Sequence, residues 1–230
     1  MKYMKVCQCA AVFFLSFQLT FAIAQNVKEI DTKGSGEIKQ FLSASFGSKE
    51  AVVKQAIGVD FKIKEGDIRS DVDTYSGMRF LEVSVPSFRP LDMPATVRYM
   101  FGYSCACLTQ VKVDWKLPEQ LAADKRAVLT MSTAELVKHL SEKNWLADQV
   151  VTDRAIGEVK LGASLPFVFF RGVNVRNTAV VFSGEPVQIL ADKNSPGKFS
   201  ADFDKMRSIQ LFYQLDSKNP DVRKINVQGF

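Results

Sequence analysis

Residues 97–115, with the sequence VRYMFGYSCACLTQVKVDW, decide the fold class of this chain. Large apolar or aromatic side chains occupy every second position of residues 97–103, and an apolar/polar alternation is established again at residues 110–115. A period of two is typical of strands that bury one face and expose the other, as in an antiparallel sheet. The stretch therefore predicts two neighbouring strands with a turn at residues 104–107.

Similar strand patterns recur along the chain, and helical patterns precede them in each half. Helical spacing of apolar residues predicts helices at residues 38–46, 48–58 and 132–144. Gly47 and Gly58 are expected to end the first two helices, and Ser48 is expected to cap the second. Residues 66–77 have no apolar period and predict a loop. Further strands are expected at residues 81–85, 167–171, 178–182, 209–215 and 222–227.

Helices grouped ahead of runs of strands indicate an α+β fold rather than alternating βαβ units. We expect two tandem units, each with short helices packed on one face of an antiparallel β-sheet. The first unit is expected at residues 36–116 and the second at residues 117–230. The expected core residues are Phe41, Val53, Phe101 and Trp115 in the first unit, and Leu136, Leu140, Phe169 and Leu211 in the second.

The first 24 residues have the pattern of a secretory signal peptide. Lys2 and Lys5 precede an apolar run at residues 10–21, and Ala22 and Ala24 are small residues at the positions that a signal peptidase reads. We therefore expect export to the periplasm or secretion, with residues 25–35 as a flexible lead-in. No later apolar run approaches the ~20 residues of a membrane-spanning helix, so no transmembrane segment is expected after signal removal.

The charge is mildly positive and spread along the chain. There are 30 Lys and Arg residues against 25 Asp and Glu, a formal net charge of +5. No basic stripe of the kind that follows a phosphate backbone is present in the sequence. Nucleic acid is therefore not an expected partner.

A family resemblance is carried by residues 47–53, GSKEAVV, together with Gly58. These residues resemble the opening helix pair of small envelope proteins of the SmpA/OmlA type and of the β-lactamase-inhibitor-protein fold. Residues 99–102 and 108–113 resemble the central hairpin of those proteins. The resemblance covers residues 36–116 and implies a helix pair on a small antiparallel sheet, which occurs twice in tandem in the inhibitor proteins. The lipidated cysteine of the SmpA type is missing, and the resemblance says little about function.

Cys105 and Cys107 form the most chemically distinctive pair in the chain. In an exported protein, two thiols this close are expected to be oxidised or bound. A structural disulfide that staples the turn is the favoured interpretation, with two half-buried thiols as the alternative. Thiol exchange is a further alternative, and copper or zinc binding has only half a ligand set here.

Other motifs do not complete a catalytic or metal site. His139 is the only histidine, which excludes multi-histidine zinc sites. Ser104 lies in a partial G-x-S-x-[GA] motif, but a strand rather than a helix is expected after it. Asp67, Asp71 and Asp73 are interpreted as a solvated acidic loop rather than a calcium site. We therefore expect no catalytic, cofactor-binding or metal-binding residues and no cofactor.

Together these patterns favour an exported, non-catalytic envelope or secreted protein. It is expected to bind a protein or other envelope partner through a sheet face or a loop. The alternative is a periplasmic protein that is thiol/disulfide-active through Cys105 and Cys107, or one that binds a small ligand in a cavity between helices and sheet.

Overall fold

The computed structural model describes residues 38–224, except residues 159, 192–198, 203 and 205. The predicted signal peptide, residues 1–24, and the lead-in, residues 25–35, lie outside the described residues. In chain order, the elements are β1 (Gln40–Phe41), β2 (Ala44–Ser45), α1 (Glu50–Phe61), η1 (Glu65–Asp67), β3 (Arg69–Val72), β4 (Arg79–Phe88), β5 (Met93–Phe101), β6 (Leu108–Lys116), α2 (Ala123–Ser141), η2 (Ala147–Gln149), β7 (Val151–Ala155), β8 (Ser164–Val173), β9 (Ala179–Ala191), β10 (Phe199–Asp202) and β11 (Ser208–Gln214).

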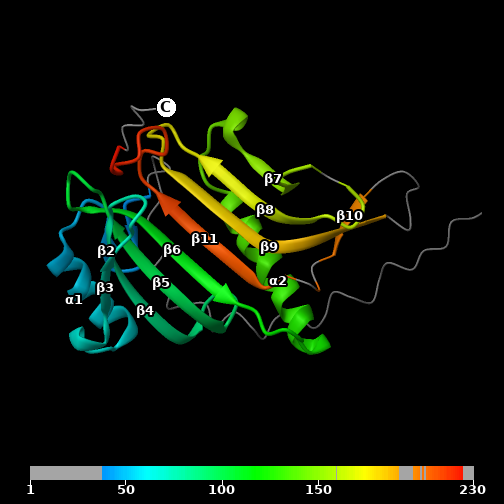
Figure 1. The fold of residues 1–230 in the computed structure, drawn as a ribbon, viewed down its shortest axis with the longest axis horizontal. Coiled ribbons are helices and arrows are strands. Elements are labelled where there is room, and N and C mark those ends of the chain that lie inside the picture. Colours follow the sequence, from blue (N-terminus) through cyan, green and yellow to red (C-terminus); the bar gives the residue numbers. More distant parts are fainter. Residues whose placement is uncertain (1–37, 159, 192–198, 203, 205, 225–230) are drawn as a thin grey trace, which may run out of the picture.

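A large antiparallel sheet dominates the structure and confirms the α+β class (Figure 1). Its strands follow the order β3-β4-β5-β6-β11-β9-β8-β7, and β10 pairs with β9. The two strands predicted on either side of the cysteines are β5 and β6, and they pair in antiparallel register. In the middle of the sheet, β6 pairs with β11, so strands from both halves of the chain share one sheet.

The two α-helices of the described residues, α1 and α2, and the β1-β2 hairpin pack on the same face of this sheet, here called the covered face. In Figure 1, α2 passes behind the strands and α1 lies at the β3 end of the sheet. The covered-face side chains of β4, β5, β6, β9 and β11 join those of α1 and α2 in one hydrophobic cluster. The two expected cores are therefore a single cluster. Of the eight expected core residues, Phe41, Val53, Phe101, Trp115, Leu140, Phe169 and Leu211 are buried, and Leu136 is partly buried against them.

The predicted helix at residues 38–46 is wrong. These residues form the β1-β2 hairpin, in which Leu42 takes a left-handed backbone conformation with φ of 51°. The Phe41 ring lies 5.9 Å from Tyr99 and 5.6 Å from Tyr213, measured between ring centroids. Contacts with aromatic rings that are distant in sequence thus stabilise a hairpin here, although the local apolar spacing indicates a helix.

The second predicted helix is present, but its ends differ from the prediction. Lys49 rather than Ser48 is the N-cap residue, and no side chain caps this end by a hydrogen bond. The helix continues through Gly58 to Phe61 and ends at Lys62, which has a φ of 55°. Phe61 packs against Phe88 with ring centroids 5.9 Å apart, which offsets the cost of a glycine inside the helix.

Three further expectations are corrected. The predicted loop at residues 66–77 contains η1 and the edge strand β3, whose side chains are all exposed and therefore show no apolar alternation. The helix expected to begin at Ser132 begins instead at Ala123, since residues 123–131 contain no helix breaker. The last predicted strand is not formed at residues 222–224, and its remaining residues lie outside the described part of the chain.

Neither α1 nor α2, the helices of the described residues, has the combined length and apolarity needed to cross a lipid bilayer.

Candidate functional site

Cys105 and Cys107 lie together in the turn between β5 and β6. Their Sγ atoms are 2.11 Å apart and their Cα atoms 5.1 Å apart. Ala106, between them, has a φ of 47°, in the left-handed region that few residues other than glycine adopt. The turn is closed by backbone hydrogen bonds from Gly102 N–H to the Cys107 carbonyl and from Ala106 N–H to the Gly102 carbonyl.

Asp221, far away in the sequence, holds the backbone of this turn. Its carboxylate accepts hydrogen bonds from the N–H groups of Ser104 and Cys105, each at 2.9 Å, and its carbonyl oxygen accepts one from Tyr103 N–H. The N–H groups of Cys105 and Ser104 hold the pKa of this carboxyl below its usual range, since they favour its charged form. A Cβ at Gly102 would lie only 2.4 Å from the Asp221 carboxylate, so only glycine allows this approach.

Asp221 belongs to the C-terminal strap, which we define as residues 215–224. The strap crosses the end of the sheet where three hairpin turns meet. Ser217 N–H donates to the Asn177 carbonyl in the β8-β9 turn, and Arg223 N–H donates to the Ser76 carbonyl in the β3-β4 turn. With Asp221 on the β5-β6 turn, the strap therefore ties turns from both halves of the chain together.

A cleft of about 310 Å³ lies beside the cysteine turn, between the first turn of α1 and the end of the sheet. Lys49, Arg79 and Tyr103 are among its lining residues. The Lys49 ammonium donates a hydrogen bond of 2.7 Å to the Cys105 carbonyl oxygen, which connects α1 to the cysteine turn. This end of the molecule is therefore held by polar contacts around a surface cleft.

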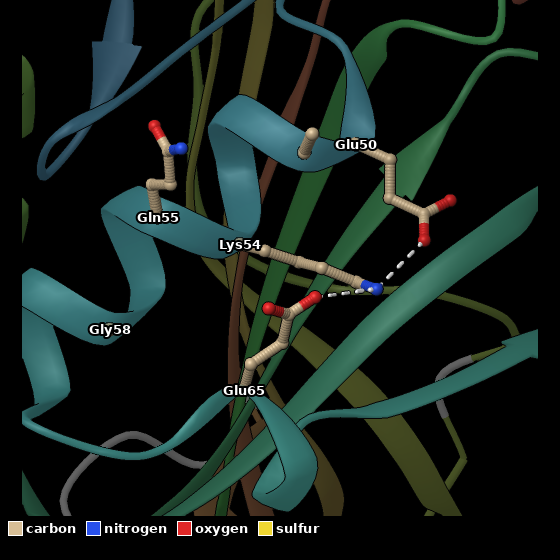
Figure 2. A pocket seen from close by; sticks show the side chains of 6 residues that line it. Glu50, Lys54, Gln55, Gly58 and Glu65 are labelled. Carbon is tan, nitrogen blue, oxygen red and sulfur yellow. Dashed lines mark ion pairs between the residues drawn. The ribbon is translucent and has the colours of Figure 1, made fainter.

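A second cleft, of about 510 Å³, lies on the outer side of α1 next to η1 (Figure 2). Lys54 extends between two carboxylates and forms ion pairs with Glu50 at 3.5 Å and Glu65 at 3.3 Å. Both acids neutralise the cation within the cleft. Among the residues that line this cleft, the one cation is therefore already paired with both carboxylates.

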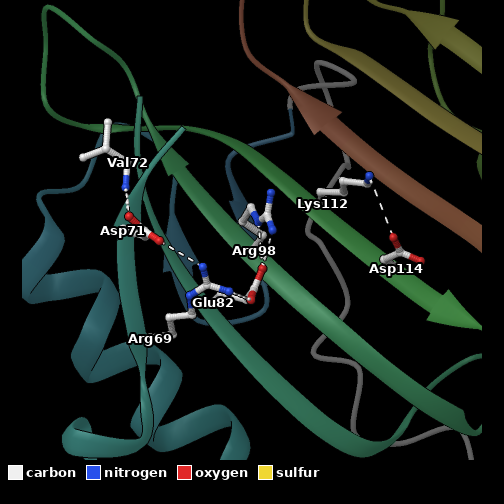
Figure 3. Close-up of polar contacts among 7 residues, drawn as sticks. All are labelled: Arg69, Asp71, Val72, Glu82, Arg98, Lys112 and Asp114. Atoms are coloured by element: carbon white, nitrogen blue, oxygen red, sulfur yellow. Dashed lines mark hydrogen bonds and ion pairs between the residues drawn. The ribbon is translucent and has the colours of Figure 1, made fainter. Parts of the chain in front are cut away.

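The face of the sheet opposite the core, here called the open face, carries an ion network (Figure 3). Glu82 on β4 accepts two hydrogen bonds from Arg98 on β5, one from Nε at 2.9 Å and one from Nη2 at 2.5 Å. Its other oxygen pairs with Arg69 on β3 at 3.3 Å. Both guanidinium groups also lie over the Phe80 ring, Arg98 at 4.3 Å and Arg69 at 5.8 Å from its centroid. These contacts fix the arginines in one orientation.

Further along the open face, β6 carries Lys112 and Asp114, whose side chains are 34% and 26% exposed. Lys112 Nζ lies 3.9 Å from Oδ2 of Asp114, whereas Oδ1 is buried and has no hydrogen-bond partner among the described residues. Phe212 on β11 is the register partner of Lys112, and its side chain is half-buried. The open face thus combines charged groups with partly exposed apolar surface.

The other residues singled out from the sequence do not come together. His139 is exposed on α2, and Ser104 is followed by strand β6 rather than a helix. Asp71 pairs with Arg69, whereas Asp73 accepts hydrogen bonds from Ser76. Within the described ranges, no group of three or more His, Cys, Asp or Glu side chains could hold a metal ion.

The sequence did not point to Asp221, Lys49 or the arginine network. Asp221 lies 116 residues from Cys105 and Lys49 lies 56 residues from it, so no local spacing links them. The alternation along β4 and β5 does contain Glu82 and Arg98 as the outward residues. That pattern shows which face they occupy, but not that they are paired.

Comparison with known proteins yields no relative. No protein-family model matches the chain, and no curated protein and no solved structure matches it significantly. The resemblance to small envelope proteins therefore depends only on the short motifs at residues 47–58 and 99–113.

Proposed function

We propose that this protein is an exported, non-catalytic protein that binds a protein partner in the cell envelope or outside the cell, through the open face of its sheet. The observation that carries the proposal is that both helices and the β1-β2 hairpin pack on the opposite face. The open face keeps partly exposed residues along neighbouring strands, among them Arg98, Lys112 and Phe212.

The network around Glu82 supports binding rather than packing. A side chain that is already fixed loses little conformational entropy when a partner contacts it. Arg98 is 34% exposed, yet it is held by Glu82 and stacked on Phe80. Arginine and aromatic side chains of this kind often contribute much of the binding energy at protein interfaces.

Two finer points belong to the same proposal. Each half of the chain has one α-helix, α1 or α2, ahead of strands that are neighbours in the sheet. The final strands of the two halves, β6 and β11, pair at the centre of the sheet. This arrangement supports a tandem origin, with units at residues 36–116 and 117–230, and a relation to the β-lactamase-inhibitor-protein fold.

The proposal of export depends on the signal-peptide pattern. N-terminal sequencing of the exported protein should give Gln25 as its first residue.

The binding proposal is tested by comparing two single variants as bait in an envelope extract. Phe212→Ala removes an apolar group from the middle of the open face, whereas Val175→Ala removes one from the exposed β8-β9 turn. Quantitative mass spectrometry should find a protein that the wild type and Val175→Ala retain and that Phe212→Ala loses. Equal retention by all three baits would contradict binding through the open face.

A further inference from the structure

The smaller cleft, of about 310 Å³, has a composition that the open-face proposal does not use. Three separate parts of the chain form it, since Lys49 and Glu50 begin α1, Gly77 and Arg79 lie at the start of β4, and Tyr103 belongs to the β5-β6 turn. The Tyr103 ring lies directly over Gly77, where a Cβ would be 3.0 Å from its Cδ2 atom. A volume at the low end of ligand pockets suits one or two side chains of a partner.

Positive charge exceeds negative charge around this cleft. Lys49 donates its hydrogen bond to the Cys105 carbonyl, and the Arg223 guanidinium donates to the Thr74 carbonyl. Because both acceptors are neutral oxygens, these hydrogen bonds do not neutralise either positive charge. Glu50 is shared, with one oxygen 3.2 Å from Arg79 and the other 3.5 Å from Lys54. Lys54 is also paired with Glu65, so the excess comes from the residues that line the cleft, where Lys49 and Arg79 carry two positive charges against the single carboxylate of Glu50.

The nearby acidic groups are turned toward the backbone of the protein. The Asp221 carboxylate accepts two N–H groups of the cysteine turn, and the Asp73 carboxylate accepts the backbone N–H and the hydroxyl of Ser76. The side chains that remain exposed at this end include Tyr75, 83% exposed, and Tyr103, 53% exposed. Tyrosine and arginine are enriched at protein-binding surfaces.

We propose that this cleft binds an acidic segment of a protein partner, whose carboxylate side chain pairs with the Lys49 ammonium and the Arg79 guanidinium. The exposed tyrosines contact the residues that flank that side chain. The cleft is pre-formed, because Asp221 holds the turn that carries Tyr103. The Cys105 carbonyl of the same turn accepts the Lys49 hydrogen bond. The surface lies on the α1 side of the sheet, so this binding is independent of the open face.

The test uses a fluorescein-labelled hexaglutamate peptide as the probe and fluorescence anisotropy as the readout. Lys49→Met removes the ammonium and keeps most of the aliphatic chain. Lys125→Met, exposed on α2, makes the same change in net charge away from the cleft. We expect the wild type and Lys125→Met to bind equally, and Lys49→Met to bind about tenfold more weakly, as the loss of a charge-assisted hydrogen bond implies. Binding should also weaken as salt is raised.

A second measurement identifies the bound residues in the unmodified protein. On titration with hexaglutamate, amide NMR signals of Lys49, Gly77 and residues 102–106 should shift, and those of α2 should not. Absence of binding, equal weakening in both variants, or equal binding of a hexaglutamine peptide would each overturn the proposal. Stronger binding of phosphatidylglycerol vesicles at the same amides would also overturn it, in favour of an anionic membrane surface.

Discussion

The two faces of the sheet are stabilised by different chemistry, although the same strands supply both. On β4, β5 and β6, the covered-face residues Leu81, Tyr99 and Val111 are completely buried in the hydrophobic cluster. On the same strands, the open-face residues Glu82 and Arg98 keep 14% and 34% exposure and pair with each other. The comparison shows that apolar packing holds one face, whereas charged pairs and partly exposed side chains occupy the other, the face to which we assign partner binding.

The largest expected effect comes from a covered-face substitution, Trp115→Ala. Trp115 is fully buried, its ring lies 5.9 Å from the Phe88 ring between centroids, and its indole N–H donates to the Phe88 carbonyl. Its loss should lower the free energy of unfolding by ~3–5 kcal/mol, measured by urea denaturation. Phe212→Ala on the open face should cost ~1 kcal/mol or less. Similar losses for the two variants would contradict the division of roles between the faces.

A second covered-face prediction concerns Gly172 on β8. A Cβ at this position would lie 2.5 Å from the Trp145 ring, which packs against Phe170 and donates its indole N–H to the Leu140 carbonyl at the end of α2. Gly172→Ala should therefore lower stability by ~1–3 kcal/mol through overpacking. Gly66→Ala is the control, because open space surrounds that position. Equal changes in melting temperature for the two variants would show that Trp145 is not closely packed against Gly172.

The covered face is also the part of the molecule that the sequence predicts best. Alternation identifies β5, β6 and β11 because one side of each strand is buried and the other is not. The β1-β2 hairpin escapes prediction, since Phe41 is placed by rings from β5 and β11 that are remote in sequence. Edge strands β3 and β7 have mostly exposed side chains and therefore lack an apolar signal. At the candidate site, the cysteines are visible as a local motif, whereas the Asp221 contact depends on the final fold.

The cysteine turn tests whether a covalent link at the end of the sheet affects either face. Cys105→Ser combined with Cys107→Ser removes the link that we expect between them. Because that link closes a very short loop, the chain-entropy account gives it less than the ~3 kcal/mol expected for a 15-residue loop. The double variant should remain folded and exported, and should keep its open-face partner. A double variant that folds but no longer functions, together with a wild-type pair that exchanges with glutathione at a measurable potential, would favour the redox alternative.

The strap should make the same end of the molecule sensitive to acid. The pKa of Asp221 is lowered in the folded state by the Cys105 and Ser104 N–H groups. Its stabilising contribution is therefore complete above the ordinary aspartate pKa of 3.8 and is lost as the pH falls through the lower folded value. We expect Asp221→Asn to reduce the loss of stability between pH 5 and 2 relative to the wild type, by ~1 kcal/mol or less because the carboxylate is partly exposed. Identical pH profiles in chemical denaturation would exclude this contribution.

The smallest expected effect on stability belongs to the open-face network itself. Arg98→Lys keeps the charge but removes the two hydrogen bonds that Nε and Nη2 donate to one oxygen of Glu82, and the planar contact with Phe80. A double-mutant cycle of Arg98→Lys with Glu82→Gln should give a coupling energy of ~0.5–1 kcal/mol, and this coupling should decrease at high salt because the pair is partly exposed. If the face exists for binding, Arg98→Lys should weaken partner binding by a larger factor than it changes the unfolding equilibrium. A coupling energy of several kcal/mol, without an effect on binding, would instead identify Arg98 and Glu82 as structural elements of the sheet. The distinction between the two faces would then be one of composition only.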